Sequence, residues 1–167
     1  MKFKSLAIAA TLALGAAGAF AGGGPITFLD GTAGFSATDA ASPGLITDVF
    51  TFSLDAQYDT NASAISIKLG KNDWDFKSIT INGPSGPFSF SAAPGSTDAL
   101  EIWTLSTVRL SAGDYTLSVD GYVNGGARSG SYGGNINISA VPEPESYALM
   151  LAGLGALGFV ARRRSRV

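Results

Sequence analysis

The central part of the chain, residues 22–140, predicts an all-β fold: a single antiparallel β-sandwich of eight or nine strands, jelly-roll or immunoglobulin-like. Apolar and polar side chains alternate along short runs, as in residues 64–69 (AISIKL). Glycine, proline, asparagine and serine separate these runs. No stretch between them has the apolar repeat of an amphipathic helix. These three observations together favour two sheets packed on one core.

The alternating runs place the strands in order along the chain. Longer strands are expected at residues 45–54, 64–69, 74–81, 100–110, 114–123 and 132–139. Shorter strands are expected at residues 26–29, 34–37 and 88–91. A glycine-rich segment precedes and begins the last strand, with Gly125, Gly126, Gly130, Gly133 and Gly134. It has no lysine and serine of the kind found in a phosphate-binding loop, so we expect a hairpin loop there.

The central region is acidic, with eleven Asp and Glu against five Lys and Arg, a net charge near −6. A surface of this sign argues against nucleic acid as a partner, because phosphate binding needs a basic face. The chain has no cysteine and no histidine, which excludes thiol catalysis, thiolate metal sites and haem attachment. No cofactor is expected.

Catalysis is not expected either. Without histidine, a serine nucleophile would need a lysine base, and Lys68, Lys71 and Lys77 lie in strand or turn contexts without a serine motif. Paired carboxylates for glycoside hydrolysis would need a substrate cleft, for which a small sandwich leaves little chain. The sequence therefore predicts a protein that is not an enzyme.

Residues 1–21 have the pattern of a secretory signal peptide. Lys2 and Lys4 precede an apolar run, and Ala19 and Ala21 form a small-residue cleavage pattern, with cleavage expected after Ala21. Alternatives are a first transmembrane helix or a buried core helix. The signal peptide predicts export through the Sec machinery.

Residues 141–167 form a separate C-terminal segment. The prolines near its start predict a stiff, exposed linker. The uncharged residues 147–161 predict a short transmembrane helix of about 22 Å, which must recruit its flanks to cross a bilayer core of roughly 30 Å. A basic tail follows and places the central domain outside the cytoplasmic membrane: Arg162, Arg163, Arg164 and Arg166.

This segment resembles the PEP-CTERM sorting signal of Gram-negative bacteria. The resemblance rests on Pro142-Glu143-Pro144, on the apolar AGLGALGF sequence and on the terminal arginines. It implies processing by an exosortase near the Pro-Glu-Pro element after transient anchoring in the inner membrane. It also implies a final place at the cell surface or in the extracellular matrix, associated with exopolysaccharide and biofilm. The alternative is an ordinary tail anchor that stays attached.

A second motif lies in the strand expected at residues 45–54. Ile46, Asp48 and Phe50 share one face, so a carboxylate stands among apolar side chains. The motif resembles the FxDxF group of PEP-CTERM proteins, with Ile46 in place of the first phenylalanine. Asp48 is expected at a rim of the sandwich, or as an acceptor of backbone or hydroxyl hydrogen bonds. The alternative is a cation ligand.

Two further sets of residues are candidates for binding. Asp73 and Asp75 could offer oxygens to calcium, but they lack a full calcium-loop pattern, so turn chemistry explains them better. Trp74 and Trp103 are candidate sugar contacts, although the core or a cross-strand pair is the commoner place for such rings in a sandwich. The sequence thus predicts a non-catalytic exported surface or matrix protein. The alternative function is a small carbohydrate-binding module delivered by the same route.

Overall fold

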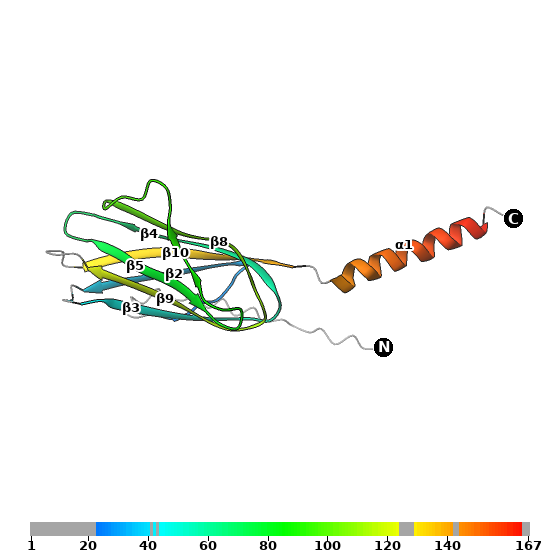
Figure 1. Cartoon of the computed structure of the whole chain (residues 1–167), viewed down its shortest axis with the longest axis horizontal. Helices are drawn as coiled ribbons and strands as arrows, with labels where there is room; N and C mark the ends of the chain where they lie inside the picture. Colours follow the sequence, from blue (N-terminus) through cyan, green and yellow to red (C-terminus); the bar gives the residue numbers. More distant parts are fainter. Residues whose placement is uncertain (1–22, 41, 43, 124–128, 142–143, 165–167) are drawn as a thin grey trace, which may run out of the picture.

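A computed structural model shows two five-stranded sheets packed face to face and one C-terminal helix beyond them (Figure 1). The structure describes residues 23–40, 42, 44–123, 129–141 and 144–164. The ladders are antiparallel except for β1 and β3, which pair in parallel. The predicted antiparallel β-sandwich is therefore confirmed.

Each sheet takes strands from distant parts of the sequence. Sheet A contains, in spatial order, β1 (Gly23–Pro25), β3 (Ile46–Leu54), β9 (Gly113–Val123), β5 (Trp74–Asn82) and β6 (Phe88–Ser89). Sheet B contains β2 (Thr32–Ala40), β10 (Ser129–Ala140), β4 (Tyr58–Ile67), β8 (Leu100–Leu110) and β7 (Ser91–Ala92). Helix α1 spans Pro144–Arg164.

The pairing of the strands is nested, as in a jelly roll. β2 pairs with β10, β3 with β9, β4 with β8, and β5 with β6. Nested pairs of this kind come from one long hairpin that folds over on itself into two sheets. Of the two sandwich types that the sequence left open, the structure has the jelly roll.

The core lies between the inner faces of the two sheets. Every second residue of β2 and β3 is buried, so each strand contributes one face, as the alternation predicts. Aromatic rings fill much of this space, and the rings of Phe52 and Tyr115 stack with centroids 5.3 Å apart. The fully buried side chains include Trp74, Ile79, Ile81, Leu110, Leu117, Val119 and Ile136.

Some strand bounds differ from the prediction, for reasons that lie in tertiary structure. The strand expected at residues 26–29 is replaced by β1, which ends at Pro25. The strand expected at residues 88–91 divides at the buried Phe90, because Ser89 pairs with sheet A and Ser91 with sheet B. The chain therefore crosses from one sheet to the other at this point.

The expected hairpin loop is also corrected. Gly130, Gly133 and Gly134 lie inside β10, while Gly125 and Gly126 lie outside the described residues. A Cβ atom on Gly134 would collide with the ring of Phe35 and the carbonyl oxygen of Ser63. This glycine is needed because neighbouring groups approach its backbone closely.

Candidate functional site

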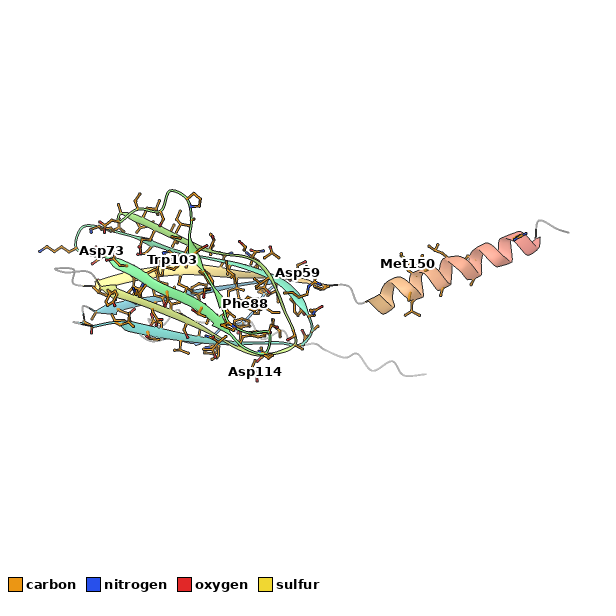
Figure 2. The ribbon with its side chains drawn as sticks, viewed as in Figure 1. Asp59, Asp73, Phe88, Trp103, Asp114 and Met150 are labelled. Carbon is orange, nitrogen blue, oxygen red and sulfur yellow. The ribbon has the colours of Figure 1, made fainter. Side chains whose placement is uncertain are left out.

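The C-terminal segment forms a helix, as the sequence predicts, but this helix extends beyond the expected residues 147–161 and includes Pro144 and Glu145 of the expected linker. Helix α1 begins at Pro144 and ends at Arg164, so Arg162, Arg163 and Arg164 all lie in its last turn. The described side chains from residue 148 to 157 are all exposed. Met150, for example, projects from the helix away from any strand (Figure 2). These exposed side chains are available to contact another surface.

The transmembrane assignment of this helix is not supported. Across the described part of the chain, no helix is both long enough and apolar enough to cross a membrane. The uncharged run covers fifteen of the 21 helical residues, and many of its members are alanine or glycine, which contribute little hydrophobicity.

Several predicted sorting residues lie outside the described residues. These are Ala19 and Ala21 of the signal peptide, Pro142 and Glu143 of the Pro-Glu-Pro element, and Arg166 of the basic tail. The signal peptide and its cleavage after Ala21 remain predictions.

The structure places the two candidate sugar contacts in or against the core. Trp74 is 1% exposed, so its ring cannot stack on a sugar at the surface, and the prediction for this residue is wrong. Alternation along β5 explains the correction, because Trp74 and Phe76 are buried while Asp75 between them is half-buried. Trp103 is half-buried, and its ring packs at 6.0 Å from that of Phe76. No surface platform of two tryptophans exists in this fold.

The FxDxF-like motif lies on β3 with its side chains on the inner face. Ile46 is half-buried and packs against the core, Phe50 is buried, and Asp48 is 0% exposed. Asp48 is therefore fully buried on the inner face of β3, between β1 and β9, and does not lie at an open rim. The expected hydroxyl hydrogen bond is confirmed: the Tyr132 hydroxyl donates to Asp48 Oδ2 at 2.7 Å.

Sequence reasoning missed the residue that faces Asp48. Asp39 on β2 is buried and lies within hydrogen-bonding reach of the Asp48 carboxyl group. Burial, followed by the charge of Asp48, raises the pKa of Asp39 from 3.8 to about 6. The sequence contained a signal for this position, because Asp39 follows Ala33, Phe35 and Ala37 at two-residue spacing and therefore shares their inner face.

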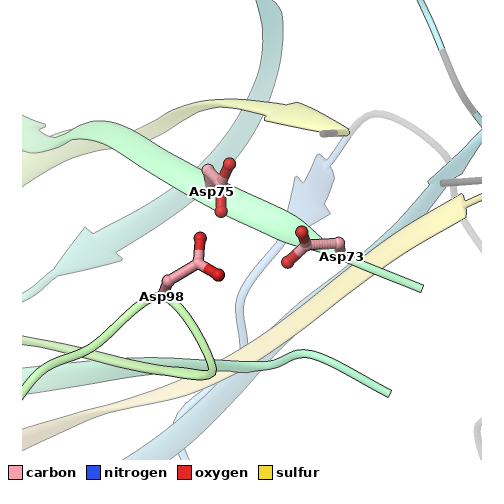
Figure 3. A group of neighbouring side chains, drawn as sticks. All are labelled: Asp73, Asp75 and Asp98. Atoms are coloured by element: carbon pink, nitrogen blue, oxygen red, sulfur yellow. The ribbon is translucent and has the colours of Figure 1, made fainter. Parts of the chain in front are cut away.

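A second group of carboxylates lies near the start of β5, where Asp73 is buried, Asp75 is half-buried and Asp98 is exposed. The carboxylate oxygens of Asp73, Asp75 and Asp98 lie within 4.8 Å of one another (Figure 3). Lys68 already places its ammonium group there, 2.7 Å from Asp73 Oδ2 and 3.0 Å from Asp98 Oδ2. Oxygen ligands of this kind suit calcium, but here a lysine supplies the positive charge. This arrangement favours a structural ion-pair network.

Two acids beside this network, Asp75 and Glu101, have raised pKa values. Burial, and then the charges of Asp73 and Asp98, raise the pKa of Asp75. Burial also raises the pKa of Glu101, which accepts a hydrogen bond from the Phe76 backbone N–H at 2.7 Å. Both acids therefore bind protons more tightly in the folded protein than in the unfolded chain.

A shallow groove of about 680 Å³ lies beside β1. It is lined by residues 25–28 together with parts of β3 and β9. Asp114 is the one carboxylate in this lining, and it accepts a hydrogen bond from the Ser53 hydroxyl at 2.6 Å. A single carboxylate already held by a serine does not make an acid–base pair.

The outer face of sheet B carries a set of uncharged polar side chains, which we call the polar ladder: Thr32, Asn61, Ser63, Asn135 and Asn137. Asn137 accepts a hydrogen bond from Thr32 at 3.1 Å and donates one to Asn61 at 3.1 Å. Ser63 donates to Asn135 at 2.6 Å. The ladder therefore crosses three strands with its amides and hydroxyls already oriented.

The C-terminal segment matches the PEP-CTERM protein-sorting motif over residues 140–164. The resemblance seen in the sequence is thus confirmed, and the chain carries this motif. The motif implies an exported protein that an exosortase sorts to the cell surface. No curated protein matches the sequence.

Two solved structures have similarity to the chain. One is the pre-peptidase C-terminal domain of collagenase from Bacillus anthracis, with 13% identity and a TM-score of 0.39, covering 71% of this chain and 93% of that one. The other is PliG from Aeromonas hydrophila, a periplasmic inhibitor of g-type lysozyme, with 12% identity and a TM-score of 0.37, covering 71% and 96%.

Proposed function

We propose that this chain is a non-catalytic surface or matrix protein of a Gram-negative bacterium, which an exosortase processes near Pro142-Glu143-Pro144. The observation that carries the proposal is the sorting motif at residues 140–164. In this proposal, residues 1–21 direct export through the Sec machinery and are removed. Residues 22–140 are the delivered domain. The final place is the cell surface or the extracellular matrix, in association with exopolysaccharide.

The structure of the C-terminal segment supports a role as a sorting signal that is removed by cleavage. Helix α1 has exposed apolar side chains and ends in arginines, so it suits contact with the inner membrane and its anionic headgroups. The sandwich forms its own core from residues between Ile26 and Ile138, and none of the described side chains of α1 belongs to that core. Removal of the helix would therefore leave the packing of the domain intact.

The geometry of the sandwich supports the non-catalytic part of the proposal. Among the described residues, the buried pair Asp39 and Asp48 is closed to substrate, and Lys68 forms ion pairs with Asp73 and Asp98 of the second carboxylate group. The groove beside β1 holds one carboxylate, bonded to Ser53. None of these arrangements joins a nucleophile, a base and an open cavity.

The first test compares the natural host with a strain that lacks its exosortase. We expect most of the protein at the cell surface in the natural host. In the deletion strain, we expect the full chain to accumulate in the inner-membrane fraction, because the apolar helix is not removed. Immunoblotting of the fractions measures both. The same location and size in both strains would contradict processing by an exosortase.

A second candidate function, binding of a neutral glycan, is favoured by the polar ladder. Sugars are recognised by amides and hydroxyls that are held in fixed directions, and the ladder offers such groups on the outer face of sheet B. The exposed Ile65 and Ile67 continue the same face along β4 and supply apolar contact area. A small carbohydrate-binding module would use this face rather than Trp74.

The glycan prediction is tested by retention on purified exopolysaccharide. Replacing both Asn135 and Asn137 with alanine should weaken retention on the order of tenfold, as the loss of about two hydrogen bonds would. The matched control is Thr116→Ala with Ser118→Ala on the outer face of sheet A. Equal retention of the wild type and both double variants would contradict a binding role for the ladder.

A further inference from the structure

Two carboxyl groups are buried together between the sheets, near the connection from β2 to β3. Asp39 is 7% exposed and Asp48 is 0% exposed. Asp39 comes from sheet B and Asp48 from sheet A, so their contact joins the two layers. Such a pair is costly in an apolar interior unless its charge or its hydrogen bonds are compensated.

The hydrogen bonds of the pair are incomplete. The Tyr132 hydroxyl donates to Asp48 Oδ2 at 2.7 Å. Asp48 Oδ1 and Asp39 Oδ2 are buried and have no hydrogen-bond partner among the described residues. In the described part of the chain, no lysine or arginine forms an ion pair with either carboxylate. Two orphaned acceptors on neighbouring carboxyl groups point to a missing donor or cation.

We propose that Asp39 and Asp48 share one proton taken from water, and that this proton makes one end of the sandwich sensitive to pH. A single proton turns one carboxyl group into a donor and leaves the other as its acceptor, so both groups gain a partner at once. Tyr132 holds the opposite oxygen of Asp48. The pair thereby becomes a hydrogen-bonded bridge between the two sheets.

The groups that surround the pair are consistent with a shared proton. From β10, Tyr132 acts as a donor, and burial followed by the hydrogen bond to Asp48 raises the pKa of its phenol. From β5, the neighbouring group is the uncharged ring of Trp74. Its centroid lies 4.9 Å from that of the Tyr132 ring. The raised pKa of Asp39 has the sign expected for the partner that keeps the proton.

The sign of the pH effect follows from this shift. Because the pKa of Asp39 rises from 3.8 to about 6 on folding, the folded protein binds the proton more tightly than the unfolded chain. The stabilisation is fully present below about pH 4 and is lost as the pH rises through about 6. Above that pH, two negative charges face each other inside the sandwich.

The element expected to respond is the end of β2. This strand is at the edge of sheet B and pairs with β10 alone among the described strands. Asp39 is its second-last residue and pairs with Gly130. An edge strand has the fewest hydrogen bonds to hold it against repulsion, so we expect its last residues to open first.

The test is equilibrium unfolding of the full chain by urea, from about pH 4 to about pH 7.5. In the wild type, the unfolding equilibrium constant should rise by on the order of tenfold to a hundredfold more than in Asp39→Asn across this range. Asp48→Asn should flatten the profile in the same way. Asp114→Asn, an exposed acid outside the pair, is the control and should keep the wild-type profile. Any pH dependence of unfolding that remains in Asp39→Asn is assigned to other acids, such as Asp75 and Glu101.

A second measurement does not depend on the variants. Side-chain carboxyl ¹³C shifts of the folded wild type should show one aspartate that titrates near pH 6 and is assigned to Asp39. Identical pH profiles for wild type and Asp39→Asn, or titration of Asp39 near its ordinary value, would overturn the proposal. A calcium-dependent or sodium-dependent rise of the urea midpoint at about pH 7.5, present in wild type and absent in Asp39→Asn, would also overturn it, because a metal ion would then occupy the pair.

Discussion

Replacing Trp74 with alanine is expected to lower the free energy of unfolding by about 3–5 kcal/mol. The side chain is 1% exposed and packs against Tyr132 with ring centroids 4.9 Å apart. Its ring also fills the space above Gly121, where an added Cβ atom would lie 2.6 Å from the indole. Truncation would leave a large cavity that strands on both sheets cannot close. Urea unfolding monitored by far-UV circular dichroism measures the loss.

Trp103→Ala is the matched control for this prediction. Its ring is half-buried and packs against Phe76 at the margin of the core, so a clearly smaller loss is expected. Similar stability for Trp74→Ala and the wild type would contradict the placement of Trp74 in the core. It would also reopen the interpretation of this residue as a sugar contact.

The second prediction concerns the arginines at the end of the chain. Replacing Arg162, Arg163, Arg164 and Arg166 with glutamine should strongly reduce the processed fraction of the protein. Each basic residue near an anionic membrane surface contributes about 1 kcal/mol, so the four changes remove several kcal/mol of retention at the inner membrane. An exosortase would then meet its substrate for less time. Immunoblotting of cell fractions measures the ratio of processed to full chain.

The control replaces an arginine of the folded domain. Arg109 binds Asp59 at 2.9 Å on the surface of sheet B, and this exposed pair should contribute little to stability. Arg109→Gln should therefore leave processing unchanged. Normal processing of the variant without terminal arginines would contradict their role in sorting.

The parts of the fold that the sequence predicted best are those in which large apolar residues alternate with polar ones. In β3, Phe50, Phe52 and Leu54 mark the inner face without ambiguity. In β2, two of the inner positions are Ala33 and Ala37, which carry a weak signal, so the predicted strand covered four of its nine residues. Pairing order depends on contacts between distant residues, which alternation does not encode.

The candidate sites also differ in how far local sequence could predict them. The sorting motif is local, continuous and terminal, so the sequence was enough to recognise it. The buried pair forms because Asp39 and Asp48 meet between the two sheets. The local sequence of neither strand predicts that contact. For Trp74, the sequence left both the core and a sugar contact open, and strand alternation places it in the core because Trp74 and Phe76 occupy the inner positions of β5.

Intact-mass analysis of the protein recovered from the cell surface of an exosortase-competent host tests the central claim most directly. We predict a species that begins near Gly22, ends near Pro142-Glu143-Pro144, and lacks residues 147–167. A surface species that still carries residues 161–167 would contradict exosortase processing and would show that the C-terminal segment remains attached.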